Sequence, residues 1–318
     1  MIVAITGGTG FIGRKLVLRH LERGDEVRVF SRRSLGESGL PDSVRWCRGN
    51  LIKHDGLHAF VDKADVLYHC AGEIRETTHM ETLHVEGTQN LVEAANGKIG
   101  RWVQLSSVGV YGSVGKGMIT ETTALNPGGE YEITKTKSDL LVTDAANRGG
   151  FSYSILRPSN VFGAGMPNQS LFAMISMIDR GIFFFIGKPG ASANYIHVDN
   201  VVEGLMACGT MPQAEGRIYN LSDICTMEHF VAVIADALGC TAPRIRIPKL
   251  LAQLVGITVG KIPGFPLTQA RVNALSLRSN YPVTRIQQEL GYQHLVSMED
   301  GLQELVKEYM QRCRHAVN

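Results

Sequence analysis

A glycine-rich loop near the start of the chain limits the fold more than any other feature of the sequence. Residues 2–6 are a short apolar, β-branched run that predicts a buried strand, and residues 11–23 have the apolar spacing of a helix. A tight strand-to-helix turn needs residues without a Cβ atom, and the N–H groups at a helix start attract an anion. The loop therefore predicts a βαβ unit that binds the pyrophosphate of a dinucleotide. The residues expected at this turn are Gly7, Thr9, Gly10, Phe11, Ile12 and Gly13.

The same alternation of strand and helix continues along the first half of the chain. Helical patterns cover residues 81–96 and 131–148. Strand patterns cover residues 26–31, 44–47, 66–70, 101–107 and 153–156. Such alternation predicts an α/β fold, a Rossmann-like doubly wound parallel sheet.

After about residue 160 the pattern becomes less regular, with frequent Gly and Pro. We therefore predict a dinucleotide-binding Rossmann domain over residues 1–160. Residues 161–318 form a smaller C-terminal lobe that mainly binds the substrate. Segments near 195–202 and 218–221 are expected to return to the main sheet.

The end of the second predicted strand bears on which dinucleotide is bound. An NAD site usually carries Asp or Glu there, whose carboxylate binds the ribose hydroxyls. This chain has Ser31, Arg32 and Arg33 instead, and their hydroxyl and guanidinium groups suit a 2′-phosphate. NADP(H) is therefore the expected cofactor, with NAD(H) possible. The alternative is that both arginines are solvated surface residues.

Three side chains form an expected catalytic set. Tyr131 and Lys135 lie four residues apart on a predicted helix, so both project from one face. A neighbouring ammonium and an oxidised nicotinamide would lower the pKa of the phenol, which could then exchange a proton with a carbonyl oxygen. Ser107 ends a predicted strand at the ligand-binding edge of the sheet, and its hydroxyl can bind the same oxygen. The alternative for Ser107 is a helix cap or a loop hydroxyl.

Motifs of one enzyme family recur along nearly the whole chain. Besides the glycine loop and Tyr131 with Lys135, they are the stretches 105–112 (LSSVGVYG), 156–163 (LRPSNVFG) and 195–200 (YIHVDN). The chain thereby resembles the extended short-chain dehydrogenase/reductase family, which includes nucleotide-sugar epimerases and dehydratases. The resemblance implies that Ser107, Tyr131 and Lys135 are catalytic, with Lys135 also holding the nicotinamide ribose. It further implies an adenine contact at Asn50 and Leu51, a cofactor lining of Cys70, Ala71 and Gly72, and a substrate contact at Asn160.

The chain also departs from the family pattern. Residues 191–194 contain no arginine, although sugar-nucleotide epimerases often carry one there to hold phosphate. The helix that usually reads Asn-x-x-Gly-Thr begins here with His84. Ser107 is not followed by the Asp-Glu pair of the 4,6-dehydratases, which disfavours dehydration.

These observations favour a keto-reductase or epimerase that acts on a nucleotide-sugar. Reduction fits NADP(H) better, because epimerases of this family recycle a tightly held NAD. Asn160 favours the sugar, and Arg278 is the expected replacement contact for phosphate. The alternative is a reductase of an apolar ketone or aldehyde, similar to dihydroflavonol reductases or 3β-hydroxysteroid dehydrogenases, which the missing arginine favours. A cofactor-binding protein without catalysis is a third reading, which the intact Ser107, Tyr131 and Lys135 disfavour.

Composition argues against several other classes. The formal net charge is +2 with no basic block, so we expect no nucleic-acid partner. No apolar run approaches the ~18 residues of a membrane helix. The six cysteines form no Cys-x-x-Cys pair and the ten histidines have no metal-ligand spacing, so we expect no metal and a cytoplasmic protein. Apolar residues such as Leu140 and Leu141, together with the family resemblance, predict a homodimer built from the helices 81–96 and 131–148.

Overall fold

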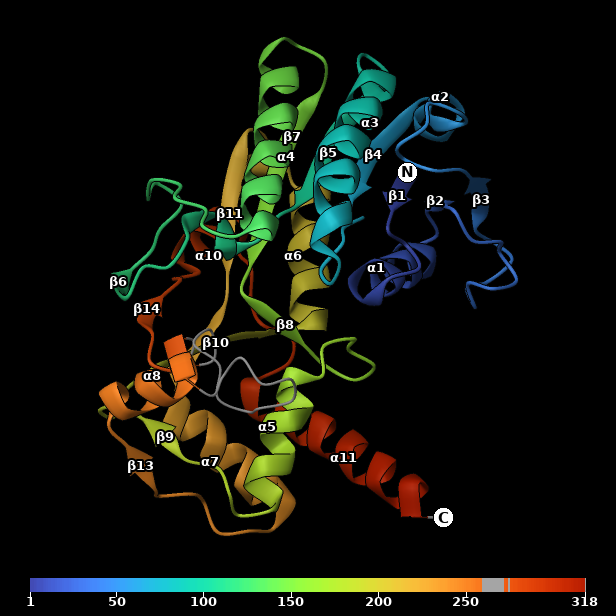
Figure 1. The fold of residues 1–318 in the computed structure, drawn as a ribbon. Helices are drawn as coiled ribbons and strands as arrows, with labels where there is room; N and C mark the ends of the chain where they lie inside the picture. Colours follow the sequence, from blue (N-terminus) through green and yellow to red (C-terminus); the bar gives the residue numbers. More distant parts are fainter. Residues whose placement is uncertain (259–271, 274, 318) are drawn as a thin grey trace.

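The computed structural model describes residues 1–258, 272, 273 and 275–317. Seven parallel strands form the main sheet in the order β11-β7-β5-β4-β1-β2-β3 (Figure 1). Their bounds are β1 Ile2–Thr6, β2 Glu26–Ser31, β3 Arg45–Arg48, β4 Ala64–His69, β5 Ile99–Leu105, β7 Ser152–Pro158 and β11 Arg217–Leu221. The strand order reverses between β1 and β4, and doubly wound sheets bind ligands at such a reversal, beyond the carboxyl ends of the strands. The predicted fold class is confirmed.

Helices cover both faces of this sheet. Their bounds are α1 Phe11–Glu22, α2 Leu57–Val61, α3 Gly87–Ala95, α4 Glu130–Asn147 and α6 Val198–Thr210. Leu16 of α1 and Val201 of α6 pack on one face with Val3 and Ile5 of β1. Helices α2, α3 and α4 pack on the other face around the fully buried Trp102. The chain therefore winds to both sides of the sheet, as a parallel sheet with two buried faces requires.

Local sequence explains where the two helices nearest the site begin. Helix α1 starts after Gly10, whose extended backbone ends the loop. Helix α4 starts after Gly129, and the Glu132 carboxylate accepts hydrogen bonds from the N–H groups of Gly128 at 2.7 Å and Gly129 at 3.1 Å. Glu130 and Glu132 also place negative charge in the first turn, where the helix dipole favours it.

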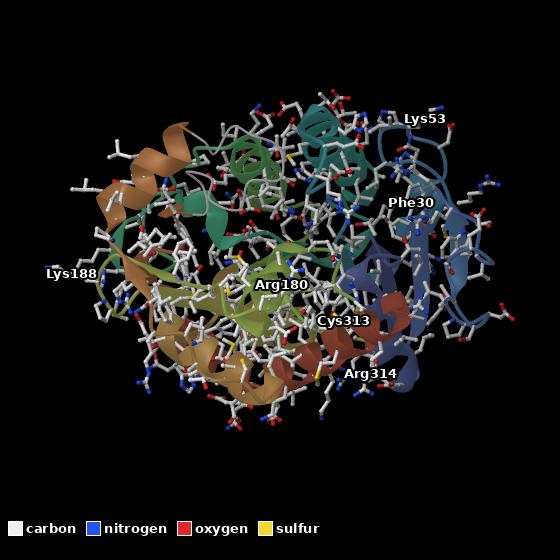
Figure 2. All side chains as sticks on the ribbon, turned by 60° about the horizontal axis from the view of Figure 1, so that its bottom comes forward. Phe30, Lys53, Arg180, Lys188, Cys313 and Arg314 are labelled. Atoms are coloured by element: carbon white, nitrogen blue, oxygen red, sulfur yellow. The ribbon has the colours of Figure 1, made fainter. Side chains whose placement is uncertain are left out.

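The C-terminal elements form a second apolar core. The helices α5, α7 and α11 pack around Phe230 and Leu302. Among the described residues the α-helices of this C-terminal part are α5 Ser170–Asp179, α7 Met227–Leu238, α8 Lys249–Thr258, α10 Thr284–Leu290, which packs on the core of the main sheet, and α11 Met298–Val317. Its strands are β8 Asn160–Phe162, β9 Phe185–Ile186, β10 Ser192–His197, β12 Asp223–Thr226, β13 Arg246–Ile247 and β14 Arg278–Asn280, and β14 pairs with β6 Lys116–Met118. Figure 2 places Phe30 and Lys53 over the N-terminal strands and Lys188 on the opposite side of the molecule.

One predicted return to the main sheet is wrong. Strand β11 joins the sheet beside β7, but β10, with Tyr195 and His197, pairs with β8 and β12 in a separate three-stranded sheet. The reason is that β8 follows β7 after Ser159 and pairs with β10 rather than with any strand of the main sheet. Residues 198–202 belong to α6, which lies on the main sheet without joining it.

Short helical segments complete the fold. The 3-10 helices are η1 Thr77–His79, η3 Val108–Tyr111 and η4 Pro212–Ala214. The helix predicted over residues 81–96 begins as a π-helix, η2 Thr82–Glu86, and continues as α3. Over the residues that the structure describes, none of the helices has the length and apolar character needed to cross a membrane.

Candidate active site

Glycines let the loop after β1 approach two other parts of the backbone. Gly7 has a φ of +68°, and a Cβ atom there would lie 2.6 Å from backbone atoms of Cys70 and Ala71. A Cβ atom on Gly13 would lie 2.2 Å from the carbonyl oxygen of Gly7. The first turn of α1 carries no acidic residue, and its N-cap Gly10 provides no side-chain cap. Its N–H groups are thus open to an anion, which fits the pyrophosphate of a dinucleotide. Thr9, Phe11 and Ile12 are partly exposed beside them.

The end of β2 presents free arginines. Arg32 and Arg33 are exposed, and within the described residues their guanidinium groups make no hydrogen bond or ion pair. The Ser31 hydroxyl accepts a hydrogen bond from the Arg33 N–H at 3.2 Å. Strand pairing sets Arg48, also exposed, opposite Ser31. Sequence reasoning missed Arg48, because its position depends on the register between β2 and β3.

A side chain of α1 fixes the loop that follows these arginines. Arg14 donates hydrogen bonds to the carbonyl oxygens of Ser38 at 2.6 Å and Gly39 at 2.5 Å. Trp46 donates to the carbonyl oxygen of Arg33 at 3.0 Å. The loop between β2 and β3 is therefore tied to the glycine loop by way of α1.

The two segments expected along the cofactor lie at the same edge of the sheet. A Cβ atom on Gly49 would lie 2.3 Å from the Phe30 ring, so the chain before Asn50 and Leu51 packs directly on β2. Asn50 is partly exposed, and its side-chain oxygen accepts from Ile52 N–H at 3.3 Å. After β4, the N–H of Ala71 donates to the Thr6 hydroxyl at 3.3 Å and Gly72 is exposed. Burial raises the pKa of Cys70 to about 12, so its thiol stays protonated.

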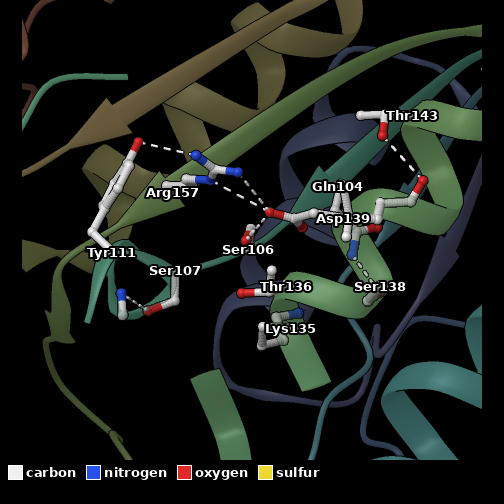
Figure 3. Close-up of polar contacts among 12 residues, drawn as sticks. Gln104, Ser106, Ser107, Tyr111, Lys135, Thr136, Ser138, Asp139, Thr143 and Arg157 are labelled. Carbon is white, nitrogen blue, oxygen red and sulfur yellow. Dashed lines mark hydrogen bonds and ion pairs between the residues drawn. The ribbon is translucent and has the colours of Figure 1, made fainter. Parts of the chain in front are cut away.

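Ser107 and Tyr131 meet at the carboxyl end of β5. The Ser107 hydroxyl oxygen accepts a hydrogen bond from Gly109 N–H at 3.1 Å and caps η3 (Figure 3). Its own proton remains available to a second partner. A hydrogen bond with Ser107 lowers the pKa of Tyr131, but burial and the negative charge of Asp139 outweigh it and raise that pKa to about 12.

Lys135 contacts the backbone at the end of β5. Its ammonium group is buried and donates to the carbonyl oxygen of Leu105 at 2.6 Å. We expected Lys135 and an oxidised nicotinamide together to lower the pKa of Tyr131; the charge of Lys135 is not among the causes that act on this phenol, whose pKa is raised. The negative charge of Asp139, one turn further along α4, acts in the opposite direction on the phenol.

A buried ionic network lies behind this site. One oxygen of Asp139 accepts hydrogen bonds from the Ser106 hydroxyl at 2.7 Å and from Arg157 at 3.1 Å (Figure 3). Arg157 also donates to the Tyr111 hydroxyl at 3.0 Å, which in turn donates to Asn220 at 2.9 Å. The network joins α4 to β7 and β11. Sequence reasoning did not single out Asp139 or Arg157, although Asp139 lies four residues after Lys135 and Arg157 belongs to a recognised motif.

Besides Ser107, the residues expected to hold the substrate are Asn160 on β8 and Arg278 on β14. Asn160 is exposed on β8, and its amide donates to the carbonyl oxygen of Asn194 at 3.1 Å. The guanidinium group of Arg278 donates to the carbonyl oxygens of Lys188 and Pro189 at 2.7 Å and Gly190 at 3.1 Å. Among the described residues these bonds use three of the five N–H donors of Arg278, and two donors have no partner there.

Comparison with known proteins assigns the chain to a family. The model of the NAD dependent epimerase/dehydratase family matches residues 3–222. The chain belongs to this family. This member is accordingly an NAD(P)-dependent enzyme.

Relatives of this epimerase/dehydratase family member have several activities. It is 26% identical to "dTDP-glucose 4,6-dehydratase" of Streptomyces griseus, over 96% of this chain and 93% of the relative. It is also 26% identical to "3 beta-hydroxysteroid dehydrogenase/Delta 5-->4-isomerase" of Mycobacterium tuberculosis, over 97% and 90% of the two chains. The family alone therefore leaves the substrate open.

Solved structures share the fold over almost the whole chain. UDP-glucuronic acid 4-epimerase from Bacillus cereus, in complex with NAD, has a TM-score of 0.76 at 19% identity and covers 98% of this chain and 99% of its own. MoeE5, in complex with UDP-glucose and NAD, has a TM-score of 0.74 at 24% identity and covers 99% and 100%. At these identities the likeness concerns the fold.

Proposed function

We propose that this protein is an NADP(H)-dependent keto-reductase that acts on a nucleotide-linked sugar, or an epimerase of such a sugar that uses the same side chains. The observation that carries the reaction is the pairing of Ser107 with Tyr131 beside the glycine loop. With a pKa of about 12, Tyr131 keeps its proton at neutral pH. A protonated phenol is ready to act as an acid, which suits reduction of a carbonyl group better than oxidation of an alcohol.

Each side chain of the site has a separate role in such a reduction. A bound nicotinamide supplies the hydride. The Ser107 hydroxyl, whose oxygen already accepts from Gly109, can donate its own proton to the substrate carbonyl oxygen. As that oxygen gains negative charge, Tyr131 transfers its phenolic proton to it. The buried ammonium of Lys135 is held on the same helix by the carbonyl oxygen of Leu105, at 2.6 Å.

The preference for NADP(H) rests on Ser31, Arg32, Arg33 and Arg48. Over the part of the chain that the structure describes, the three guanidinium groups are exposed and make no hydrogen bond or ion pair, and the Ser31 hydroxyl adds a polar group at the end of β2. The nearby carboxylate of Glu37 accepts a hydrogen bond from Ser34 N–H at 3.0 Å, and this bond, together with the positive charges of Arg48 and Arg33, lowers the pKa of Glu37. A 2′-phosphate would meet positive charge here, whereas ribose hydroxyls would find no carboxylate at the end of the strand.

The relatives support a nucleotide-linked sugar as the substrate. A dTDP-glucose 4,6-dehydratase matches over nearly its whole length, and UDP-glucose is bound in the structure of MoeE5. Asn160, exposed on β8, is the proposed contact to the diphosphate. Arg278, with two N–H donors left, is the proposed second contact.

One observation favours an apolar ketone as a second candidate substrate. Residues 191–194 provide no cation, and most donors of Arg278 are bound to the backbone. A site with little positive charge would hold a diphosphate weakly. The 3β-hydroxysteroid dehydrogenase among the relatives is consistent with this candidate.

Parallel reductions distinguish the two candidates. The purified enzyme is mixed with NADPH and either a nucleotide-linked 4-keto-hexose or a 3-ketosteroid, and loss of NADPH absorbance is followed. We expect oxidation with the keto-sugar alone. Oxidation with the steroid alone would replace the first candidate by the second, and oxidation with neither, despite tight NADPH binding, would contradict both.

We also propose a homodimer that forms through α3 and α4. Leu140 of α4 is 51% exposed, which is high for a leucine on a helix that packs on the sheet with its opposite face. Exposed apolar groups on an ordered helix mark a surface suited to a partner.

A further inference from the structure

A buried histidine joins the segment after β4 to the helix that carries Tyr131. His84 lies in the π-helix η2 and is 1% exposed. One ring nitrogen, Nε2, accepts a hydrogen bond from the N–H of Glu73 at 2.8 Å. The other, Nδ1, lies 2.8 Å from the hydroxyl of Thr134 on α4. The imidazole ring is thus held at both nitrogens by two segments that are distant in sequence.

The directions of these bonds define the state of the ring. Nε2 faces an amide N–H and must therefore be unprotonated. The Thr134 hydroxyl directs its single proton toward backbone carbonyl oxygens, those of Glu130 at 2.8 Å and Tyr131 at 3.1 Å. Its oxygen therefore accepts a hydrogen bond from Nδ1–H, and the ring is the neutral Nδ1–H tautomer. Burial and the nearby Lys135 charge lower the pKa of His84 to about 4, in agreement with this state.

The ring also lies directly against both halves of the site. The rings of His84 and Tyr131 meet edge to face, with centroids 5.7 Å apart and an interplanar angle of 79°. A Cβ atom on Gly72 would lie 3.3 Å from His84 Nε2. Next to Gly72, the backbone nitrogen of Ala71 would lie 2.6 Å from a Cβ atom on Gly7. His84 therefore lies between the ring of Tyr131 and the segment after β4, which in turn packs on the glycine loop.

The local backbone explains how His84 reaches this place. A π-helix widens one turn of a helix and occurs mostly as short segments at functional sites. Here the widened turn contains His84 and precedes Gly87, whose Cβ would lie 3.2 Å from Leu51. An ordinary α-helical turn over the same residues would change the direction of the His84 side chain relative to α3.

We propose that His84 is a positioning residue that sets the distance between the segment after β4 and the phenol of Tyr131. It acts through its two hydrogen bonds and through ring contact, and it exchanges no proton with the substrate. The proposal rests on the proposed role of Tyr131 as proton donor. Loss of His84 should therefore lower turnover more than affinity for the cofactor.

Two substitutions of His84 test its two hydrogen bonds one at a time. In His84→Asn the amide can reach Thr134 but not Glu73, and in His84→Gln the longer amide can reach Glu73 but not Thr134. Each should reduce kcat by about 10-fold, with the Kd for NADPH changed by less than about threefold. Thr134→Val removes the acceptor of Nδ1–H and should lower kcat in the wild type but add little in His84→Gln, because that bond is already absent. His20→Gln is the matched control, since His20 is buried on α1 and packs against Tyr68.

A second measurement needs no substrate. With ¹³C-labelled tyrosine, the Tyr131 phenol is titrated by NMR in the wild type, His84→Gln and His84→Ala. Because burial is the largest cause of the raised pKa, removal of the ring in His84→Ala should lower the Tyr131 pKa from about 12 toward its ordinary value of about 10. The ¹⁵N resonances of wild-type His84 should show a protonated Nδ1 and an unprotonated Nε2.

The outcomes are separable from those of the proposed function. An unchanged Tyr131 pKa in His84→Ala, or a protonated Nε2 in the wild type, would overturn the proposal for His84 whatever the substrate is. Equal loss of kcat in His20→Gln and His84→Gln would do the same, since it would reflect general instability. If wild-type enzyme reduces neither test ketone, the proposed function fails, while the NMR results still decide the role of His84.

Discussion

Replacing Gly13 with alanine tests whether the contact between α1 and the loop after β1 builds the dinucleotide site. The added Cβ atom would lie 2.2 Å from the Gly7 carbonyl oxygen, 2.8 Å from its carbonyl carbon and 3.0 Å from the Cα atom of Gly8. All three are backbone atoms, so no side-chain rotation relieves the clash. The start of α1 must therefore move by about 1 Å to restore ordinary contact distances.

This movement should reduce both the folding stability and the affinity for NADPH. Overpacking of this kind costs about 1–3 kcal/mol of folding stability. Shifting the N–H groups at the start of α1 should also remove at least one charge-assisted hydrogen bond to phosphate, worth about 1.5–3 kcal/mol. The Kd for NADPH should therefore rise by about 10- to 150-fold.

Fluorescence titration with NADPH and urea unfolding measure both effects. Gly115→Ala is the matched control, because a Cβ atom at Gly115 would have no neighbour within 4 Å and its φ is not positive. This control should retain wild-type affinity and stability within about 1 kcal/mol. A Gly13→Ala protein that folds and binds NADPH within twofold of wild type would refute the reasoning.

Three further predictions concern cofactor choice, pH and assembly. The double substitution Arg32→Ala and Arg33→Ala should weaken NADPH binding by about 1–3 kcal/mol and leave NADH binding nearly unchanged. If the wild-type protein binds NADH as tightly as NADPH, or more tightly, in the same titration, the preference for NADP(H) is refuted. The pKa of His84 is lowered from 6.5 to about 4 in the folded chain, so between pH 6.5 and pH 4 the unfolded chain binds more protons than the folded chain. The free energy of unfolding should therefore fall by up to about 3 kcal/mol as the pH drops through this window. Urea unfolding across the window should show a smaller slope for His84→Gln, and an identical slope would contradict the assigned pKa. Light scattering should give a dimer for wild type and a smaller species for Leu140→Glu, and a wild-type monomer at micromolar concentration would contradict the proposed interface.

The main sheet was predictable because its signals are local. Apolar β-branched runs such as residues 2–6 end at turn residues, and helical spacing follows several of them. The separate sheet around β10 was not predictable in this way. Tyr195 pairs with Asn160, and that register depends on contacts between segments far apart in the chain.

The candidate site was also predictable only in part. Sequence motifs identify Ser107, Tyr131 and Lys135, and the structure places Ser107 close enough to Tyr131 to lower the pKa of its phenol. The sequence could not reveal that Lys135 donates to the Leu105 carbonyl or that Asp139 opposes a lowered phenol pKa. Those effects depend on distances between α4 and β5 and on burial, which no local pattern encodes.

The most direct test of the central claim is the activity of Tyr131→Phe. This change keeps the ring and its packing against His84 but removes the only proton that the phenol can donate. With saturating NADPH and the ketone that the wild type reduces, turnover should fall by at least ~10²-fold, the usual effect of losing a general acid. The Kd for NADPH should remain within about threefold of wild type, because the expected phosphate contacts lie at the glycine loop and at the end of β2. Turnover within a factor of three of wild type would place the proton donor elsewhere and contradict the assignment of this site.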